Sequence, residues 1–401
     1  MEYIIGILIL VSFFGLAFYA AKGGNLMMGM LVMAILWTVL PMIGNTFPTN
    51  PAFVTANAEN VGITWIQAFS KVFQSGPEGW GTVLVNVVFG AWFGRVLLET
   101  GIASTLIRKT TELGGDKPAV TCILLCIVTT AIFSSLFGAG AVVAIGVIIL
   151  PILMSLGIPK VLSVVSFMLS IGAGMFLNPV LFGQYTAFFL DAEGRTTYPY
   201  EEYVRWGGIA LAVQLIFTIC LVLFCMRKKK TVHSWAARRP IRQKMDFAPG
   251  KSLLTPFIPV FLLIVFKVPI IMGFLIGGFY ALFVCGKLKN FRTACRTFNK
   301  DFFDGVVDTA PLVGFLLMVP MFNKAATLGI LKGIGFSTAF LAPLMIASTT
   351  VMNVSCCITQ SWIVWGISYA KVSTRDFLKM SVVCGWIICV ILQIVTFVMF
   401  G

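Results

Sequence analysis

Two long apolar segments of this chain are each interrupted near the middle by small and hydroxylated residues. The interruption in the first segment contains Ser134, Ser135, Gly138 and Gly140. The interruption in the second segment contains Thr349, Thr350, Asn353 and Ser355. Hydroxyl and amide groups can bind a carboxylate or a desolvated cation without adding charge, and glycine lets a backbone approach closely. Both interruptions therefore predict binding sites for a small anion, with or without sodium.

A further interruption is expected over residues 171–179, where Gly172 and Gly174 precede Asn178 and Pro179. Pro179 lacks the N–H group of a continuous helix, which frees carbonyl groups near Asn178. Such carbonyls can hold sodium, and the N-terminus of a half-helix attracts an anion. The alternative is that these serines and threonines cap helices and the glycines permit close helix packing.

Arg95, Glu99 and Asp308 are charged residues within predicted spans that are candidates for coupling an ion or anchoring the solute. A charge within the membrane usually has a function. Arg95 and Glu99 are one helical turn apart, so they either neutralise each other or serve as a substrate anchor or proton relay. Asp308 either couples an ion or caps its span near the cytoplasm. The single histidine, His233, lies in a basic loop and is expected to be solvated.

The elements that position these residues are predicted to be membrane-spanning helices. Hydrophobic residues make up 59% of the 401 residues and charged residues 11%, whereas soluble domains carry roughly 25% charged residues. A span needs about 20 apolar residues. The first apolar run, over residues 3–21, lacks a basic flank and a cleavage site, so it is expected to be a retained helix.

Nine spans and two re-entrant hairpins account for the apolar runs. The spans are predicted at residues 3–21, 26–43, 81–107, 161–190, 204–226, 253–268, 270–285, 305–331 and 377–400, and the hairpins at residues 120–156 and 338–367. Each hairpin consists of two half-helices that meet at one of the interruptions. Irregular backbone survives at membrane depth only inside protein or beside a watery cavity.

The loop charges orient this arrangement, because cytoplasmic loops are enriched in Lys and Arg. The basic segment 227–252 is placed inside, which puts the acidic segment 191–202 and the polar segment 45–79 outside. Lys267, Lys332 and Lys371 form a minority of cations on the outer side. The protein is thus expected to be a multi-pass protein of a bacterial-type cytoplasmic membrane, with its N-terminus outside and its C-terminus inside. The basic segment could also contact anionic lipids.

The two parts of the chain, residues 1–226 and 253–401, repeat one order of elements. Each has two spans, a longer span, a hairpin and a further span, and the first part ends with an additional span at residues 204–226 that the second part lacks. Five spans, an odd number, precede the second copy. The copies therefore face opposite ways. Local patterns agree, because the run from Phe89 to Arg95 before Gly101 resembles the run from Leu317 to Asn323 before Gly329. An inverted repeat with broken helices is typical of secondary transporters.

Residues 69–162 resemble the ion transporter superfamily, which includes gluconate, citrate and C4-dicarboxylate permeases. The resemblance rests on the run from Phe89 to Gly101, with its small residues, Arg95 and Glu99, and on the run from Ala139 to Ile158. The Ser-Asn-Thr hairpin tip of the dicarboxylate/sodium symporters is absent here. The resemblance implies a homodimer in which a scaffold domain supports a moving, elevator-like transport domain. It also implies that the solute and ions are held by both hairpin tips and by two unwound helices, at residues 171–179 and, more weakly, at residues 381–385.

The leading functional hypothesis is a secondary transporter that moves a small organic anion together with sodium or protons. The alternatives are a sodium/proton antiporter of the same superfamily and the large membrane subunit of a tripartite, binding-protein-dependent transporter. An enzyme is not expected, because a zinc protease needs two histidines and no paired buried aspartates are evident. No resident cofactor other than sodium as a coupling ion is expected. The net charge of +14 comes without any nucleic-acid-binding motif.

Overall fold

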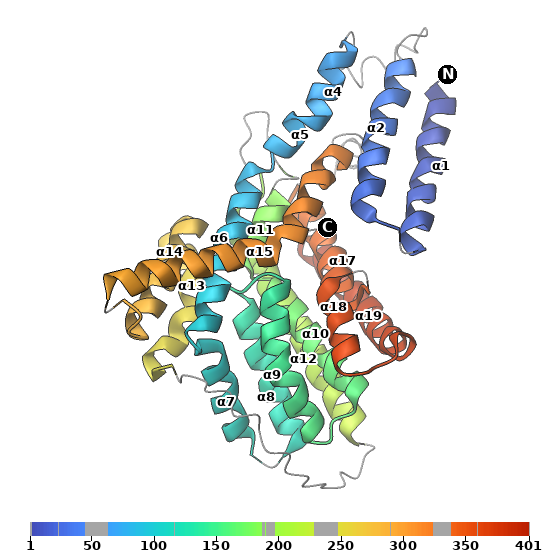
Figure 1. The fold of residues 1–401 in the computed structure, drawn as a ribbon. Helices are drawn as coiled ribbons and strands as arrows, with labels where there is room; N and C mark the ends of the chain where they lie inside the picture. Colours follow the sequence, from blue (N-terminus) through green and yellow to red (C-terminus); the bar gives the residue numbers. More distant parts are fainter. Residues whose placement is uncertain are drawn as a thin grey trace. The chain divides into compact units, whose positions relative to one another are not determined.

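The computed structural model describes residues 2–22, 24–44, 63–115, 117–186, 189, 197–227, 248–288, 290–323, 338–358 and 360–400. All regular elements in these ranges are helices (Figure 1), which confirms the all-α prediction. The chain divides into a smaller unit, Met1–Val85 with Ala310–Phe336, and a larger unit, Asn86–Thr309 with Ser337–Gly401. Each unit is described by itself.

The described helices include four that are long and apolar enough to cross a bilayer. These are Trp65–Glu99, Tyr200–Arg227, Ala342–Tyr369 and Thr374–Phe400, and a bent pair of helices after Lys160 would be a fifth. Six shorter apolar helices accompany them. The chain is thus a helical membrane protein, and the count of nine spans stays a prediction.

The smaller unit contains α1 (Glu2–Ala21), α2 (Leu26–Gly44), α4 (Trp65–Phe73), α5 (Ser75–Glu78) and the start of α6 (Gly81–Glu99). The Trp37 indole of α2 donates a 2.9 Å hydrogen bond to the Ser12 hydroxyl of α1. The side chains of Thr64 and Gln67 cap each other's backbone and start α4. Part of the segment predicted as a polar outer connection is therefore helical, and residues 45–62 lie outside the described residues.

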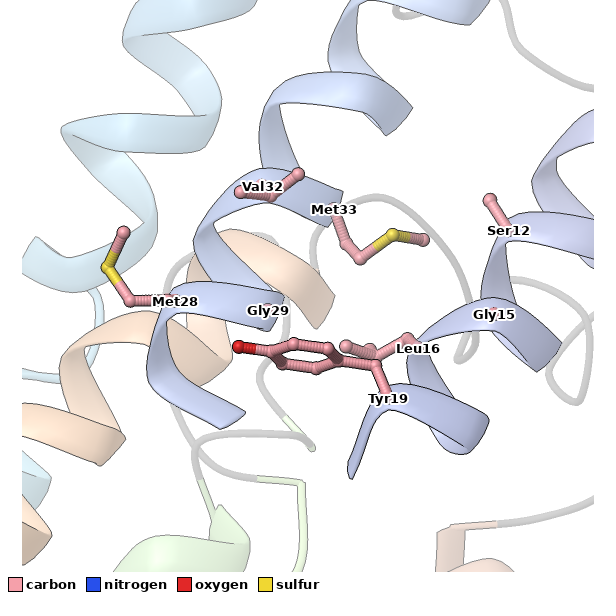
Figure 2. A pocket seen from close by; sticks show the side chains of 8 residues that line it. All are labelled: Ser12, Gly15, Leu16, Tyr19, Met28, Gly29, Val32 and Met33. Atoms are coloured by element: carbon pink, nitrogen blue, oxygen red, sulfur yellow. The ribbon is translucent and has the colours of Figure 1, made fainter. Parts of the chain in front are cut away.

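A cavity of about 400 Å³ lies between α1 and α2 (Figure 2). Ser12, Leu16 and Tyr19 line it from α1, and Met28 and Met33 line it from α2. Its walls are mostly apolar, and none of the candidate site residues contributes to it.

The span predicted at residues 81–107 is divided in the structure. Helix α6 ends at Glu99, and α7 (Ile102–Gly114) begins after Gly101, whose φ is 72°. Glycine adopts this left-handed backbone without the Cβ clash that other residues suffer. The single long span predicted here is therefore wrong.

The first predicted hairpin is interrupted where the sequence indicates. Helix α8 (Pro118–Phe133) and helix α9 (Ala139–Ser155) are separated by residues 134–138. Gly138 precedes α9 with a φ of 110°, a backbone that L side chains rarely adopt. In Figure 1, α8 and α9 run beside α10 (Lys160–Met175) and α12 (Tyr200–Arg227).

The next predicted interruption lies between α10 and α11 (Pro179–Thr186), whose axes are bent by 68°. Every residue of α10 from Leu162 to Met175 is buried. Gly172 and Gly174 lie inside this regular helix, so the unwinding predicted from residue 171 is confined to residues 176–178. The two glycines allow close packing instead, as a Cβ at Gly174 would overlap the Thr130 carbonyl.

The second half of the chain begins with a 3-10 helix at Gly250–Phe257, followed by α13 (Ile258–Phe266) and α14 (Ile270–Val284). The span predicted at residues 253–268 is thus part 3-10 helix. After α13, exposed Lys267 forms a 2.7 Å ion pair with Glu201 at the start of α12. Of the basic segment, residues 228–247 lie outside the described residues.

Helix α15 (Phe291–Asn323) contains the start of the span predicted at residues 305–331, and residues 324–337 lie outside the described part of the chain. Helix α17 (Thr338–Thr349) continues as a π-helix at Thr350–Cys356, and α18 (Ser361–Tyr369) follows. The break therefore lies at residues 357–360, later than predicted. The break predicted at residues 381–385 is wrong, because these residues lie within α19 (Thr374–Phe400).

Buried Asn178 joins the two interruptions of the first repeat. Its amide donates to the carbonyl groups of Phe133 (2.9 Å) and Leu136 (2.8 Å) at the hairpin tip. Its side-chain oxygen accepts from the N–H groups of Val180 (2.9 Å) and Leu181 (3.3 Å), which caps α11. One side chain thus satisfies four backbone groups that the broken helices would leave unpaired.

We predict that Asn178→Ala destabilises the protein by about 3 kcal/mol, since each buried polar group left unpaired costs about 1–3 kcal/mol. Thermal unfolding in detergent measures the effect. Asn290→Ala is the matched control, because exposed Asn290 caps only the Arg292 N–H at the start of α15. Equal losses of stability in the two variants would contradict the role of Asn178.

Candidate functional site

The tip of the first hairpin is held by backbone acceptors. The Ser134 hydroxyl donates to the Ala131 carbonyl at 2.8 Å, and the Ser135 hydroxyl donates to the Pro256 carbonyl of the 3-10 helix. Thr130 donates to the Ser170 carbonyl of α10 at 3.0 Å. Both tip serines are buried. Their hydroxyl protons are committed to the protein, so these side chains position the tip and leave oxygen lone pairs as acceptors.

Residues of the second interruption contact helices α10, α11 and α12. A Cβ at Gly172 of α10 would overlap the Ser355 hydroxyl. Gln214 of α12 donates to that hydroxyl at 3.3 Å and to the Leu169 carbonyl at 2.7 Å. The Tyr185 hydroxyl of α11 bonds the hydroxyls of Thr349 and Thr350. Helix α10 therefore contacts the interruptions of both repeats, and α11 contacts the second.

Asn353 is a predicted site residue that lies away from the contacts between the second interruption and helices α10, α11 and α12. Its side chain is exposed and accepts a hydrogen bond from Gln360. Val354 and Ser355 are buried on the inner face of the π-helix, so Asn353 points away from it. Asn353 was predicted as a site residue because it lies in the interruption. The direction of its side chain depends on its position around the helix, which the sequence did not give.

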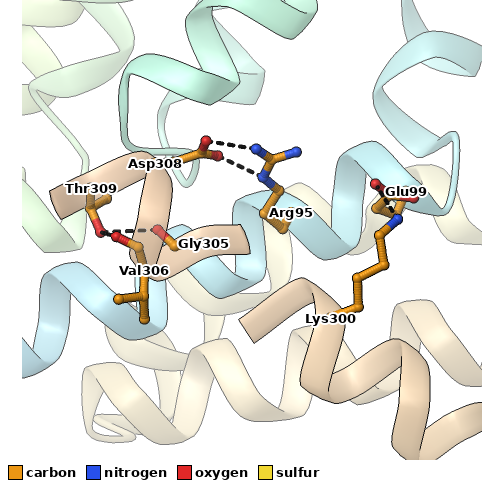
Figure 3. Close-up of polar contacts among 7 residues, drawn as sticks. All are labelled: Arg95, Glu99, Lys300, Gly305, Val306, Asp308 and Thr309. Carbon is orange, nitrogen blue, oxygen red and sulfur yellow. Dashed lines mark hydrogen bonds and ion pairs between the residues drawn. The ribbon is translucent and has the colours of Figure 1, made fainter. Parts of the chain in front are cut away.

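Arg95 binds Asp308, a residue 213 positions away, in a bidentate ion pair (Figure 3). Arg95 Nε lies 2.6 Å from Asp308 Oδ2, and Arg95 Nη2 lies 2.6 Å from Asp308 Oδ1. The side chains are 26% and 19% exposed. The Arg95–Glu99 pair expected from the sequence is replaced, because Glu99 pairs instead with Lys300 at 3.2 Å. Two ion pairs thus join α6 to α15.

The Asp308 carboxylate also lies against the first turn of α9. A Cβ at Gly140, the second residue of that helix, would overlap both carboxylate oxygens. The next residue, Thr309, lies beside Gly138 and is fixed by its own hydrogen bond to the Gly305 carbonyl at 3.0 Å. The first turn of a helix carries unpaired N–H groups and partial positive charge. Arg95 and the α9 N-terminus therefore form a position that already holds a carboxylate.

Asp301 is a buried carboxylate that the sequence reasoning missed. It is 1% exposed, and neither carboxylate oxygen has a hydrogen-bond partner among the described residues. Burial, reinforced by the charge of Glu99, raises the pKa of Asp301 to about 6. Asp301 precedes the span predicted at residues 305–331. Asp301, Asp304 and Asp308 are spaced for one helix face, which is the sequence signal that points to it.

Within the described residues, no three His, Cys, Asp or Glu side chains are grouped to hold a metal ion. A sodium ion bound by hydroxyl and carbonyl oxygens needs no such group, so sodium coupling stays a prediction.

No protein-family model matches the chain, and no curated protein matches it either.

We predict that Arg95→Gln and Asp308→Asn interact in a double-mutant cycle with a coupling free energy of about 2 kcal/mol, as expected for a bidentate, largely buried pair. Thermal unfolding of the two single variants and the double variant measures this coupling. The control cycle, Glu201→Gln with Lys267→Gln, removes an exposed pair and should give little coupling. Additive effects at Arg95 and Asp308 would contradict the prediction.

Proposed function

We propose that this protein is a secondary active transporter that moves a small organic anion, a carboxylate, across the cytoplasmic membrane. Transport is coupled to sodium or protons and proceeds by alternating access, with an elevator-like movement of one domain. The protein acts as a homodimer and contains nine spans and two re-entrant hairpins in an inverted repeat.

The observation that carries this proposal is the carboxylate of Asp308 between Arg95 and the N-terminus of α9. A carboxylate leaves water at a large cost unless it is paired and hydrogen-bonded. A guanidinium fork and a helix N-terminus together meet that need. The same two elements suit the carboxylate of a solute, which would displace Asp308 from Arg95.

The interrupted helices support a transport role. The hairpin tip, the α10–α11 bend and the π-helix are joined by Asn178 and by the contacts at Gly172 and Tyr185. Transporters commonly place solute and ion sites at such discontinuous helices. A π-helix is often found at a functional site.

The ion pairs at the helix ends support the proposed topology. Glu201 and Lys267 are both assigned to the outer side, and they contact each other. Lys300, which the loop charges put on the cytoplasmic side, contacts Glu99 near the cytoplasmic end of the span predicted at residues 81–107. The Ala248 N–H, at the end of the basic segment, donates to Thr105 beside the first cytoplasmic connection. No described pair joins residues assigned to opposite sides.

A sodium/proton antiporter is the second candidate. Buried Asp301 favours it, because an antiporter needs a titrating carboxylate away from bulk solvent.

Uptake into proteoliposomes tests the proposal, with a panel of labelled mono-, di- and tricarboxylates under separate sodium and proton gradients. We expect uptake of at least one carboxylate. Asp308→Asn should lower the KM for that anion about tenfold, because the internal competitor for Arg95 is removed. Arg95→Gln combined with Asp308→Asn should abolish uptake while the protein stays folded.

Arg108→Gln is the matched control, because Arg108 lies in an exposed pair with Glu112. Sodium-driven proton exchange without uptake of any carboxylate would replace the proposal with the antiporter.

A further inference from the structure

Asp301 is enclosed where α15 packs against α6 and α14. Phe298, one turn before it, has its ring 5.3 Å from that of Trp92 on α6 and 6.0 Å from that of Phe279 on α14. Gly305, one turn after it, approaches so closely that a Cβ would lie 2.9 Å from the Trp92 backbone nitrogen. Residues at this spacing share one helix face. Asp301 therefore lies on the face of α15 that packs against Trp92.

The contacts on this face leave polar atoms without partners. Among the described residues, neither oxygen of Asp301 has a hydrogen-bond partner, and the buried indole nitrogen of Trp92 on the facing helix has none either. An ionised carboxylate in such a place carries a large desolvation cost, whereas a protonated carboxyl group carries much less. The packing thus favours the protonated form of Asp301.

The surrounding charges point the same way. Glu99 and Arg95 act on Asp301 from α6, and Lys300 and Asp304 act from its own helix. The Phe279 ring of α14, which packs against Phe298 one turn before Asp301, carries no charge. Both cations form ion pairs with other carboxylates, Arg95 with Asp308 and Lys300 with Glu99. They therefore offset the burial of Asp301 and the charges of Glu99 and Asp304 only in part.

Asp301 is a single carboxylate, which is enough to bind a proton, whereas a divalent metal ion takes several oxygen ligands around one point. Among the described residues, no three His, Cys, Asp or Glu side chains are grouped in that way. The side chain of Glu99, on the facing helix, is 38% exposed, and its negative charge favours the protonated form of Asp301.

We propose that Asp301 binds the coupling proton of this transporter, and that the proton and the anion are linked through the Arg95–Asp308 pair on the same two helices. This inference rests on the proposed function. It assigns the ion as a proton and names the residue that carries it.

The linkage follows from the charges. A solute carboxylate that takes Arg95 releases Asp308, which adds an unpaired negative charge two turns along α15 from Asp301. That charge raises the affinity of Asp301 for a proton, which passes from water to one carboxylate oxygen and is returned to water on the other side. By thermodynamic reciprocity, protonation of Asp301 must raise the affinity for the anion by the same factor. Proton and anion therefore travel together.

The first test measures proton binding without transport, as the apparent melting temperature of the detergent-solubilised protein between pH 4 and pH 8. The folded pKa of Asp301 is about 6 and its ordinary value is 3.8. The folded state thus holds this proton more tightly than the unfolded state, and the contribution of Asp301 to stability falls as pH rises from about 4 to about 6. Asp301→Asn should remove this fall, so that the variant gains stability relative to wild type over that interval.

Glu112→Gln removes an exposed carboxylate and should leave the pH profile unchanged. Asp304→Asn leaves Asp301 in place but removes a neighbouring negative charge, so it should shift the fall to lower pH. A constant difference between wild type and Asp301→Asn over the whole range, or an unshifted profile in Asp304→Asn, would overturn the proton site.

The second test uses proteoliposomes and an anion that the wild-type protein transports. Asp301→Asn should retain exchange of labelled for unlabelled anion but lose accumulation driven by a proton gradient. Proton-driven accumulation that persists in the variant, or wild-type accumulation driven by sodium alone, would overturn the coupling role. Absence of any anion uptake by wild type would instead refute the proposed function, and the melting profiles would still decide whether Asp301 binds a proton.

Discussion

The requirement that every backbone group of an interrupted helix finds a partner away from water governs the larger unit. A continuous helix meets this requirement internally, but the breaks at residues 134–138 and 176–178 cannot. Asn178 supplies partners at both breaks, because its side-chain amide donates to carbonyl groups at the hairpin tip and its side-chain oxygen caps α11. The Ser135 hydroxyl likewise donates to a backbone carbonyl of the 3-10 helix. Neighbouring side chains thus hold both breaks in place.

The same requirement applies to charges. Arg95 pairs with Asp308 and Glu99 pairs with Lys300, whereas buried Asp301 has no hydrogen-bond partner in the described part of the chain. In the proposed transporter these groups form one connected system on α6 and α15. An incoming carboxylate changes the partner of Arg95, and the resulting charge is compensated by a proton at Asp301. The geometry therefore relates the choice of anion to the choice of coupling ion.

Local sequence signals were reliable where one residue type has one conformational consequence. Pro179 after Asn178 predicted the bend between α10 and α11, and Gly138 marks the start of α9. The signals were weaker where the position of a break depends on helical phase or on packing. Polar residues over 348–355 indicated a break, but the chain absorbs them in a π-helix and breaks at residues 357–360. Gly101 divides a run that composition alone joins into one span.

The amino-acid sequence by itself determined that the chain is helical and membrane-embedded, because hydropathy and charge content set the solvent that its surface can face. It also determined the position of the first hairpin break, because turn-forming residues act over a few positions. Only the tertiary structure decided which charges meet. Asp308 is 213 residues from Arg95, and the choice of Asp308 over nearby Glu99 depends on how α15 packs across α6. The isolation of Asp301 has the same origin, since burial belongs to the packed helices and not to the spacing of the residues.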